Sequence, residues 1–412
     1  MNTPPVPYPD EIRVHPGPAL LAGIERGPSL TAHRLQYGDL PRVDVDTLLD
    51  LVTGVGLRGR GGAAFPLATK LETVARRAGR SRRPVVVINL SEGESASSKD
   101  SALALTRPHL VLDGAVVTAR ALRATEIHVV LPAERALAAR RMREAVAERS
   151  GGPPLHLHTA EPRFVAGQSS AVIELISGRP NLPVTSWRPD AVSGLDGRPT
   201  LLSNAETWAQ LGLLALQGGA QYRRRGTAGE PGTALLTVTG THRLPQVYEV
   251  EYGARLRDVL PDAAAGAPAL IGGFHGSWAA WPTVASARVS VPGMRLLGVP
   301  LGAGVVHAPG ASICPLAFTS RIVAYLAGQS AGRCGPCLNG LPALSAALDR
   351  VTDGHDGRDR LDELAHLVVR RGACAHPDGT VRLVRSVFAA LPGEVSAHAA
   401  GGCLRTPEEL AS

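Results

Sequence analysis

Lysine, aromatic residues and long apolar runs are scarce in this chain of 412 residues. Aromatic residues make up 4% and the net charge of +7 is spread without a Lys/Arg block, so nucleic-acid binding is disfavoured. No apolar run reaches the ~18 residues of a membrane span, which excludes direct membrane insertion. The first residues lack the basic and apolar regions of a signal peptide. We therefore expect a cytoplasmic protein and leave peripheral attachment to a membrane complex open.

Only two of the 43 basic residues are lysines, Lys70 and Lys99. Arginine occupies the other basic positions, so we interpret these two as sites where a compact ammonium on a flexible stem is needed. The five cysteines indicate metal or redox chemistry before disulfides in a cytoplasmic protein. The length exceeds one ordinary core, which predicts two or three domains.

A glycine-rich run precedes Lys70. Residues 56–66 read Gly-Leu-Arg-Gly-Arg-Gly-Gly-Ala-Ala-Phe-Pro. Glycines let a backbone approach a flat or anionic ligand with its N–H groups free to bind phosphate. The spacing matches neither G-x-G-x-x-G nor G-x-x-x-x-G-K-[ST]. From the residues alone, a ligand-binding loop and a flexible surface loop both remain open.

Strands and helices alternate after this run. Short β-branched apolar segments predict buried strands at 84–90 and 127–131, and apolar periodicity predicts helices at 44–53, 109–123 and 133–149. This alternation is typical of an α/β fold with a parallel sheet. Ligands of such sheets bind at the carboxyl ends of the strands, where we expect the polar loop 89–94.

The second half of the chain has a different pattern. Short strands at 234–240 and 246–250, a short helix at 253–260 and the segment 271–276 predict a mixed β module of about 80 residues. From residue 317 the chain is mostly helical and holds four of the five cysteines.

Cys334 and Cys337 form a C-x-x-C pair between two helical stretches, and Cys374 follows another predicted helix. Two thiolates at this spacing can hold one metal or cluster. The other open interpretations are a thioredoxin-like dithiol, a zinc site completed by Cys374 and His376, and incidental thiols. Cys314, which precedes a proline, is interpreted as a buried small residue.

Five ordered motifs between about residue 35 and the C-terminus resemble the flavoprotein (NADH-binding) subunit of respiratory complex I, a family shared with some NAD-linked hydrogenases and formate dehydrogenases. The motifs are the segments 56–66, 86–100, 163–167, 197–207 and 330–340. The resemblance implies three domains: a Rossmann-like FMN-binding α/β domain at 1–228, a ubiquitin-like (SLBB) α+β domain at 229–316 and a C-terminal helical-bundle iron–sulfur domain at 317–412.

The resemblance also implies an FMN site. Five residues match positions that contact FMN in the family: Gly59, Gly61, Lys70, Asn89 and Asn204. Lys70 would offset the phosphate charge. Ser91 replaces an aspartate of the family pattern, and Ser203 replaces an asparagine. Arg58 and Arg60 either stabilise reduced, anionic FMN or are ordinary solvated charges.

An NADH site adjoins the FMN site in this family. Gly62, Phe65 and Glu94 match its NADH-facing positions, with Phe65 as the platform beneath the nicotinamide. Other contacts of the family are replaced, namely by Thr73, Gln168, Ser169, Ser186 and Pro189. Two of these replacements remove aromatic rings, each of which contributes about 0.5–1.5 kcal/mol beyond burial. We therefore expect NADH binding to be about ten-fold weaker.

Cys334, Cys337 and Cys374 match three of the four cysteine ligands of a [4Fe–4S] cluster, and Ala331 occupies the position of the fourth. A [4Fe–4S] cluster normally takes four thiolates. The resemblance therefore implies a cluster with one open iron, a [3Fe–4S] form, or loss of the cluster. The candidate replacements for the missing ligand are Cys403, His376 and Asp378.

The implied function is electron transfer of the NADH dehydrogenase type. Hydride passes from NAD(P)H to FMN, and single electrons leave through the iron–sulfur cluster to a partner such as a thioredoxin-like iron–sulfur subunit or a ferredoxin-type protein. Hydride transfer needs no side-chain acid or base, so no catalytic residue is assigned. Two alternatives remain: a degenerate paralogue that acts as an electron relay or assembly scaffold without oxidising NADH, and a zinc-stabilised scaffold.

Overall fold

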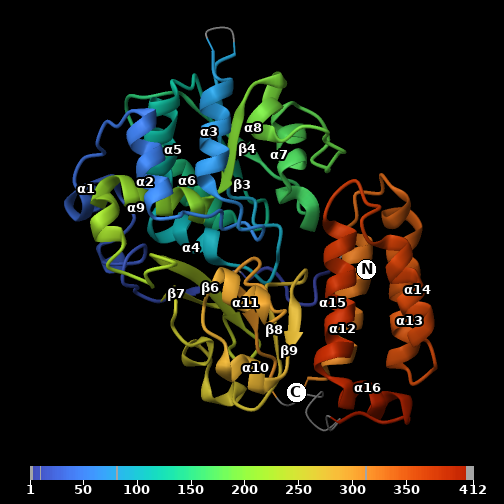
Figure 1. The fold of residues 1–412 in the computed structure, drawn as a ribbon. Helices are drawn as coiled ribbons and strands as arrows, with labels where there is room; N and C mark the ends of the chain where they lie inside the picture. Colours follow the sequence, from blue (N-terminus) through green and yellow to red (C-terminus); the bar gives the residue numbers. More distant parts are fainter. Residues whose placement is uncertain (1–2, 10, 80–81, 311–312, 405–412) are drawn as a thin grey trace.

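The computed structural model describes residues 3–9, 11–79, 82–310 and 313–404. Figure 1 shows an α/β unit, a smaller mixed β unit below it, and a helical bundle beside both. In the described residues, no helix combines the length and the apolar character that a membrane crossing requires.

The α/β unit is built on a four-stranded parallel sheet, which confirms the predicted sheet type. Its strands are β2 (Val85–Asn89), β3 (Ile127–Leu131), β4 (Leu155–Thr159) and β5 (Thr200–Asn204), in the order β4-β3-β2-β5. From β2 the chain adds β3 and β4 on one side, and it later places β5 on the other side. The strand order therefore reverses between β2 and β5, which is where open α/β sheets bind their ligands.

Helices cover both faces of this sheet (Figure 1). The predicted helices are confirmed as α2 (Val45–Gly54), α5 (Pro108–Leu122) and α6 (Ala136–Ala147), and the unit also contains α1 (Leu30–Tyr37), α3 (Leu67–Arg77), α4 (Lys99–Thr106), α7 (Ser169–Ile176), α8 (Asp190–Ser193) and α9 (Ala205–Tyr222). Helices α5 and α9 pack closely because Gly114 faces α9: a Cβ added there would lie 1.9 Å from the carbonyl oxygen of Trp208.

The mixed β unit has the strand order β1-β7-β6-β10-β8-β9. Its strands are β1 (Arg13–Val14), β6 (Thr233–Thr239), β7 (Gln246–Glu251), β8 (Ala269–Ile271), β9 (Ser277–Ala279) and β10 (Val305–His307), with the helices α10 (Trp281–Ser286) and α11 (Val291–Leu296). Strand β10 runs parallel to β6, and β7 is antiparallel to it. The helix predicted at 253–260 is shorter, a 3₁₀ turn at Leu256–Val259, because Pro261 cannot continue it.

The N-terminal segment adds β1 to this second sheet by pairing in parallel with β7. The chain then turns into the α/β unit at Leu20 and Leu21, whose side chains are fully buried. The buried carboxylate of Glu249 on β7 accepts the N–H groups of Ala19, Leu20 and Leu21 at 2.7–3.0 Å. One carboxylate thus joins the two units.

The C-terminal bundle consists of α12 (Pro315–Gly328), α13 (Leu341–Thr352), α14 (Arg358–Val368), α15 (His376–Ala390) and α16 (Pro392–Ala399). A π-helical turn at Pro336–Gly340 precedes α13 and includes Cys337. Such turns occur frequently at functional sites. Phe274 and Trp278 of the mixed β unit are buried in the same hydrophobic core as the bundle, so the bundle is packed onto that unit.

Candidate functional site

The glycine-rich run lies at the point where the strand order reverses. Asn89 and Asn204, the last residues of β2 and β5, are register partners. A Cβ added at Gly61 would lie 4.0 Å from the Cβ of Asn204, and the N–H of Arg60 donates to the hydroxyl of Thr207 at 2.9 Å. The loop therefore covers the carboxyl ends of the two strands.

The loop leaves part of its backbone available. The N–H of Gly59 donates to the carbonyl of Phe65 at 2.8 Å, which closes the loop. Between these two residues, Gly61, Gly62 and Ala63 are exposed. Across the described part of the chain, the amides of these three residues have no hydrogen-bond partner. Free, adjacent amides of this kind suit an anionic ligand.

Lys70 brings a positive charge to the same edge of the sheet. Its Nζ donates to the carbonyl of Leu202 at 2.6 Å. Partial burial lowers the pKa of Lys70, and the Asp190 carboxylate opposes this effect. An ammonium carries three donors, and only one has a partner within the described residues. Free amides and an ammonium with spare donors are groups that bind phosphate, and their joint contact with the phosphate of FMN stays a prediction.

The two strand-end asparagines bond within the protein. Asn89 donates from Nδ2 to the carbonyl of Gly167 at 2.8 Å and accepts the hydroxyl of Ser91 at 2.7 Å. Asn204 donates to both carboxylate oxygens of Asp100 at 3.1 Å. These contacts hold the neighbouring loops in place, so in this structure the asparagines and Ser91 support the site. Direct contact between their side chains and FMN stays a prediction, as it does for Ser203 on β5.

Lys99 is a buried cation between two carboxylates, a position that suits a compact ammonium. Its buried Nζ lies 3.0 Å from both the Asp100 and the Glu206 carboxylates. Burial lowers its pKa, but these two carboxylates outweigh burial and raise the pKa above its ordinary value. Glu206 also accepts the N–H of Leu235 at 3.0 Å. Lys99 therefore pairs with two buried acids, of which Glu206 joins the α/β unit to β6.

The interpretation of Arg60 as a solvated charge is wrong, and a role toward reduced FMN stays a prediction. Its side chain is buried, its Nε lies 4.0 Å from Glu206, and its guanidinium covers the ring of Tyr252 at 4.9 Å. The side chain thus points into the protein, where it anchors the loop by packing. Arg58 is exposed and donates to the carbonyl of Ala64 at 3.3 Å, so it remains a solvated charge. A pocket beside the loop is lined by Gly59, Gly62, Lys99, Glu206 and Tyr252, among others.

The residues matched to NADH contacts are spread around the loop. Phe65, near the end of the loop, is 53% exposed, as a stacking platform requires. A Cβ added at Gly62 would lie 3.7 Å from the backbone of Gly302, so Gly62 is in contact with the mixed β unit. The carboxylate of Glu94 accepts the N–H of Phe274 at 2.7 Å, and burial raises its pKa to about 7.

The three predicted cluster ligands are gathered at one end of the bundle. Burial and neighbouring Cys334 raise the pKa of Cys337 to about 11. For Cys334, burial is outweighed by hydrogen bonds from the N–H groups of Ala373 and Cys337, which lower its pKa. Burial raises the pKa of Cys374, although the side chain of Gln168 hydrogen-bonds to it. Backbone donors around several thiols are the environment that an iron–sulfur cluster requires.

Two predicted replacements for the missing cysteine are wrong. Both ring nitrogens of His376 already have hydrogen-bond partners. Its Nδ1 lies 3.1 Å from Nε2 of His275, and its Nε2 lies 2.8 Å from the carbonyl oxygen of Leu326. The sulfur of Cys403 lies within 4.8 Å of that of Cys314, which stands at the start of α12. Cys334 follows the other end of this 14-residue helix. The length of the helix, about 20 Å, therefore separates Cys403 from Cys334. Asp378 interacts electrostatically with Cys374 and remains a candidate.

The single-zinc alternative for these thiols is also not supported. Zinc needs donor atoms close together, yet in the described residues Cys334, Cys337 and Cys374 do not form a group whose sulfurs all lie within 4.8 Å of one another. A wider arrangement suits a multi-iron cluster, in which each thiolate binds a different iron. The N–H of Ala331 hydrogen-bonds to the sulfur of Cys337, which places residue 331 beside this group.

Two family models match the chain. Residues 52–212 match the Nuo51 FMN-binding domain, and residues 317–398 match the NADH-ubiquinone oxidoreductase-F iron-sulfur binding region. Together they cover more than half of the chain, including the glycine loop and the three gathered cysteines. Fold and site therefore define a protein with the two parts of an electron-transfer flavoprotein.

Curated relatives extend this likeness over nearly the whole chain. The F 2 subunit of the NADH-quinone oxidoreductase of Rhizobium meliloti is 28% identical, over 92% of this chain and 94% of that protein. The F subunit of the NADH-quinone oxidoreductase of Mycobacterium bovis is 29% identical, over 87% of this chain and 85% of that protein. The chain belongs to this family of NADH-quinone oxidoreductase F subunits as a divergent member. A solved NAD⁺-reducing [NiFe]-hydrogenase chain has the same fold, with a TM-score of 0.82 and 24% identity over 97% of this chain and 68% of the other.

The structure also shows functional residues that the sequence analysis missed. Asp100 and Glu206 hold Lys99 and Asn204 beside the loop. Glu92, with a φ of +44°, accepts the N–H groups of Asp100 and Ser101 at the start of α4. Acidic residues directly after a buried strand were visible in the sequence, but their partners lie on other elements.

Proposed function

We propose that the chain is the NADH-oxidising flavoprotein subunit of an electron-transfer complex, with FMN at the glycine loop and an iron–sulfur cluster at Cys334, Cys337 and Cys374. The observation that carries the proposal is the placement of free loop amides and Lys70 at the reversal of strand order. When bound, FMN accepts a hydride as an electron pair and releases electrons singly.

The chain itself supplies binding and orientation. The amides of Gly61 and Gly62 and the ammonium of Lys70 would hold the phosphate, and exposed Phe65 would stack on the nicotinamide. The helical bundle, packed onto the mixed β unit, would hold the cluster. Gln168 hydrogen-bonds to Cys374 and follows Gly167, which accepts from Asn89. A short path of two hydrogen bonds and the Gly167–Gln168 peptide link thus runs from Asn89 on the flavin side to Cys374 on the cluster side.

We further propose the division into domains at 1–228, 229–316 and 317–412, with an SLBB, ubiquitin-like middle domain. Support comes from the strand order β7-β6-β10-β8-β9 with β6 and β10 parallel, which is the order of a ubiquitin-like sheet. The partner of the whole chain would be another redox subunit, of the thioredoxin-like iron–sulfur or ferredoxin type. Leu338, directly after Cys337, is 61% exposed, as a docking surface beside the cluster requires.

The test is an anaerobic titration of FMN-reconstituted full chain with NADH. We expect the visible flavin absorbance to bleach at stoichiometric NADH. Lys70→Met removes a charged hydrogen bond of about 1.5–3 kcal/mol, so FMN affinity should fall about 10- to 100-fold. Arg76→Met is the matched control, because Arg76 is an exposed cation on α3 that pairs with Glu72. A flavin that resists NADH but is reduced by dithionite would refute NADH oxidation and favour the relay or scaffold alternative.

A further inference from the structure

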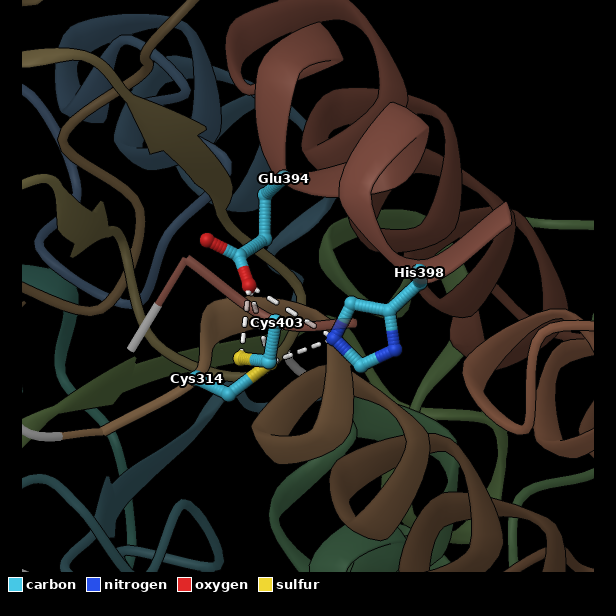
Figure 2. Close-up of side chains that lie close together, drawn as sticks. All are labelled: Cys314, Glu394, His398 and Cys403. Carbon is cyan, nitrogen blue, oxygen red and sulfur yellow. Dashed lines mark hydrogen bonds and ion pairs between the residues drawn. The ribbon is translucent and has the colours of Figure 1, made fainter. Parts of the chain in front are cut away.

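Two cysteines outside the proposed electron path lie together at the far end of the bundle. Cys314 caps the N-terminus of α12, and Cys403 follows α16. Glu394 and His398 are four residues apart on α16, so they lie on the same face of that helix. Figure 2 shows the four side chains converging from these three segments.

The donor atoms have the spacing of one coordination shell. One donor atom from each of the four residues lies within 4.8 Å of all the others. The sulfur of Cys314 lies 3.2 Å from Nε2 of His398 and 3.4 Å from Oε1 of Glu394. The sulfur of Cys403 lies 3.0 Å from the same Oε1. The edges of a tetrahedron around zinc, with bonds of about 2.0–2.3 Å, measure about 3.3–3.8 Å.

The orientation of His398 is already that of a metal ligand. Its Nδ1 lies 2.6 Å from the carbonyl of Thr352, at the end of α13. A carbonyl only accepts, so Nδ1 carries the proton, and the lone pair is on Nε2, which faces Cys314. Metal-binding histidines almost always have such a partner on the second nitrogen.

The site is largely shielded from solvent. Cys314, Glu394 and His398 are each at most 9% exposed. Burial, with Glu394 adding to it, raises the pKa of Cys314 to about 12, although the N–H of Ala317 opposes this.

We propose that Cys314, Glu394, His398 and Cys403 bind one zinc ion in a closed tetrahedral site. Two thiolates and an imidazole select zinc over magnesium or calcium. Four protein ligands leave no open position, which makes the site structural. Binding releases the two thiol protons to solvent, and it ties the segment after α16 to the start of α12 and, through His398, to α13.

The test is the metal content of full chain purified anaerobically with reductant, for the parent and two matched cysteine variants. We expect one zinc per chain in the parent and in Cys334→Ser, and loss of zinc in Cys403→Ser. Cys403 is exposed after the last helix, so its serine variant should keep the fold, which circular dichroism checks. Iron should be present in the parent and in Cys403→Ser, and it should be lost in Cys334→Ser. Failure of the proposed function would remove iron and leave this zinc result intact.

A second measurement uses Co²⁺ as a probe. Metal-free parent chain should bind one Co²⁺ with the thiolate charge-transfer bands of a tetrahedral site. His398→Gln should weaken this binding at least about 100-fold, since even partners of ligands contribute 10- to 100-fold. Three results would overturn the proposal: equal zinc in the parent and Cys403→Ser, no metal uptake by the reduced protein, or a Cys314–Cys403 disulfide in place of bound metal.

Discussion

Replacing Lys99 by methionine should destabilise the protein severely. Lys99, Asp100 and Glu206 are 3%, 5% and 2% exposed, and the ammonium lies 3.0 Å from each carboxylate. Methionine fills a similar volume but leaves Asp100 without its cation and Glu206 with only Arg60, whose Nε lies 4.0 Å away. Removing one partner of a buried ion pair costs about 3–5 kcal/mol. The melting temperature of the α/β unit should fall by about 6–20 °C, at about 2–4 °C per kcal/mol.

The comparison with the other lysine makes this prediction specific. Lys70 is partly exposed and has one carbonyl partner, so Lys70→Met should lose at most the roughly 1.5–3 kcal/mol of one charged hydrogen bond, less than Lys99→Met, while weakening FMN binding. Thermal unfolding by circular dichroism and FMN binding are measured on both variants. Adding Glu206→Gln to Lys99→Met should restore at least about 1 kcal/mol, because it removes one unpaired charge.

One outcome would refute this reasoning. If Lys99→Met melts within about 2 °C of the parent and loses FMN binding instead, then Lys99 acts as a ligand-binding cation. The buried ion pairs with Asp100 and Glu206 would then not be the main role of this residue.

Three further predictions test other parts of the structure. Ala331→Cys should raise iron content and cluster stability, because residue 331 already lies beside Cys337; unchanged iron would contradict a cluster at this loop. Folded Glu94, with a pKa of about 7, keeps a proton between pH 4.5 and 7 that the unfolded chain releases, so stability should fall by about 1–3 kcal/mol as pH rises through this window. The melting temperature of the parent should be lower at pH 8 than at pH 5, and Glu94→Gln should remove this difference. The same pH dependence in the parent and the variant would exclude Glu94 as its cause. Gly114→Ala should cost at least about 1–3 kcal/mol, because its Cβ meets the α9 backbone, whereas Gly229→Ala, which meets nothing within 4 Å, should be neutral in the same urea titration.

Local patterns in the sequence determined the parallel sheet, three of the helices beside it and the glycine-rich run. A short β-branched run such as 85–89 is a strand wherever it is buried, and a cluster of glycines is visible directly in the sequence. The ordered motifs also identified the family. These features depend on neighbours within a few residues, so one sequence is enough to predict them.

Only the tertiary structure decided which polar groups face one another. Lys70 and Lys99 are equivalent in the sequence, yet one has free donors and the other lies between two buried carboxylates. Cys314 and Cys403 lie far apart in the chain, and the packing of α16 against α12 and α13 brings them together. Such pairings depend on how helices pack across long sequence separations. Hydrophobic periodicity determines which face of a helix is buried, but not which residue of a distant segment lies opposite it.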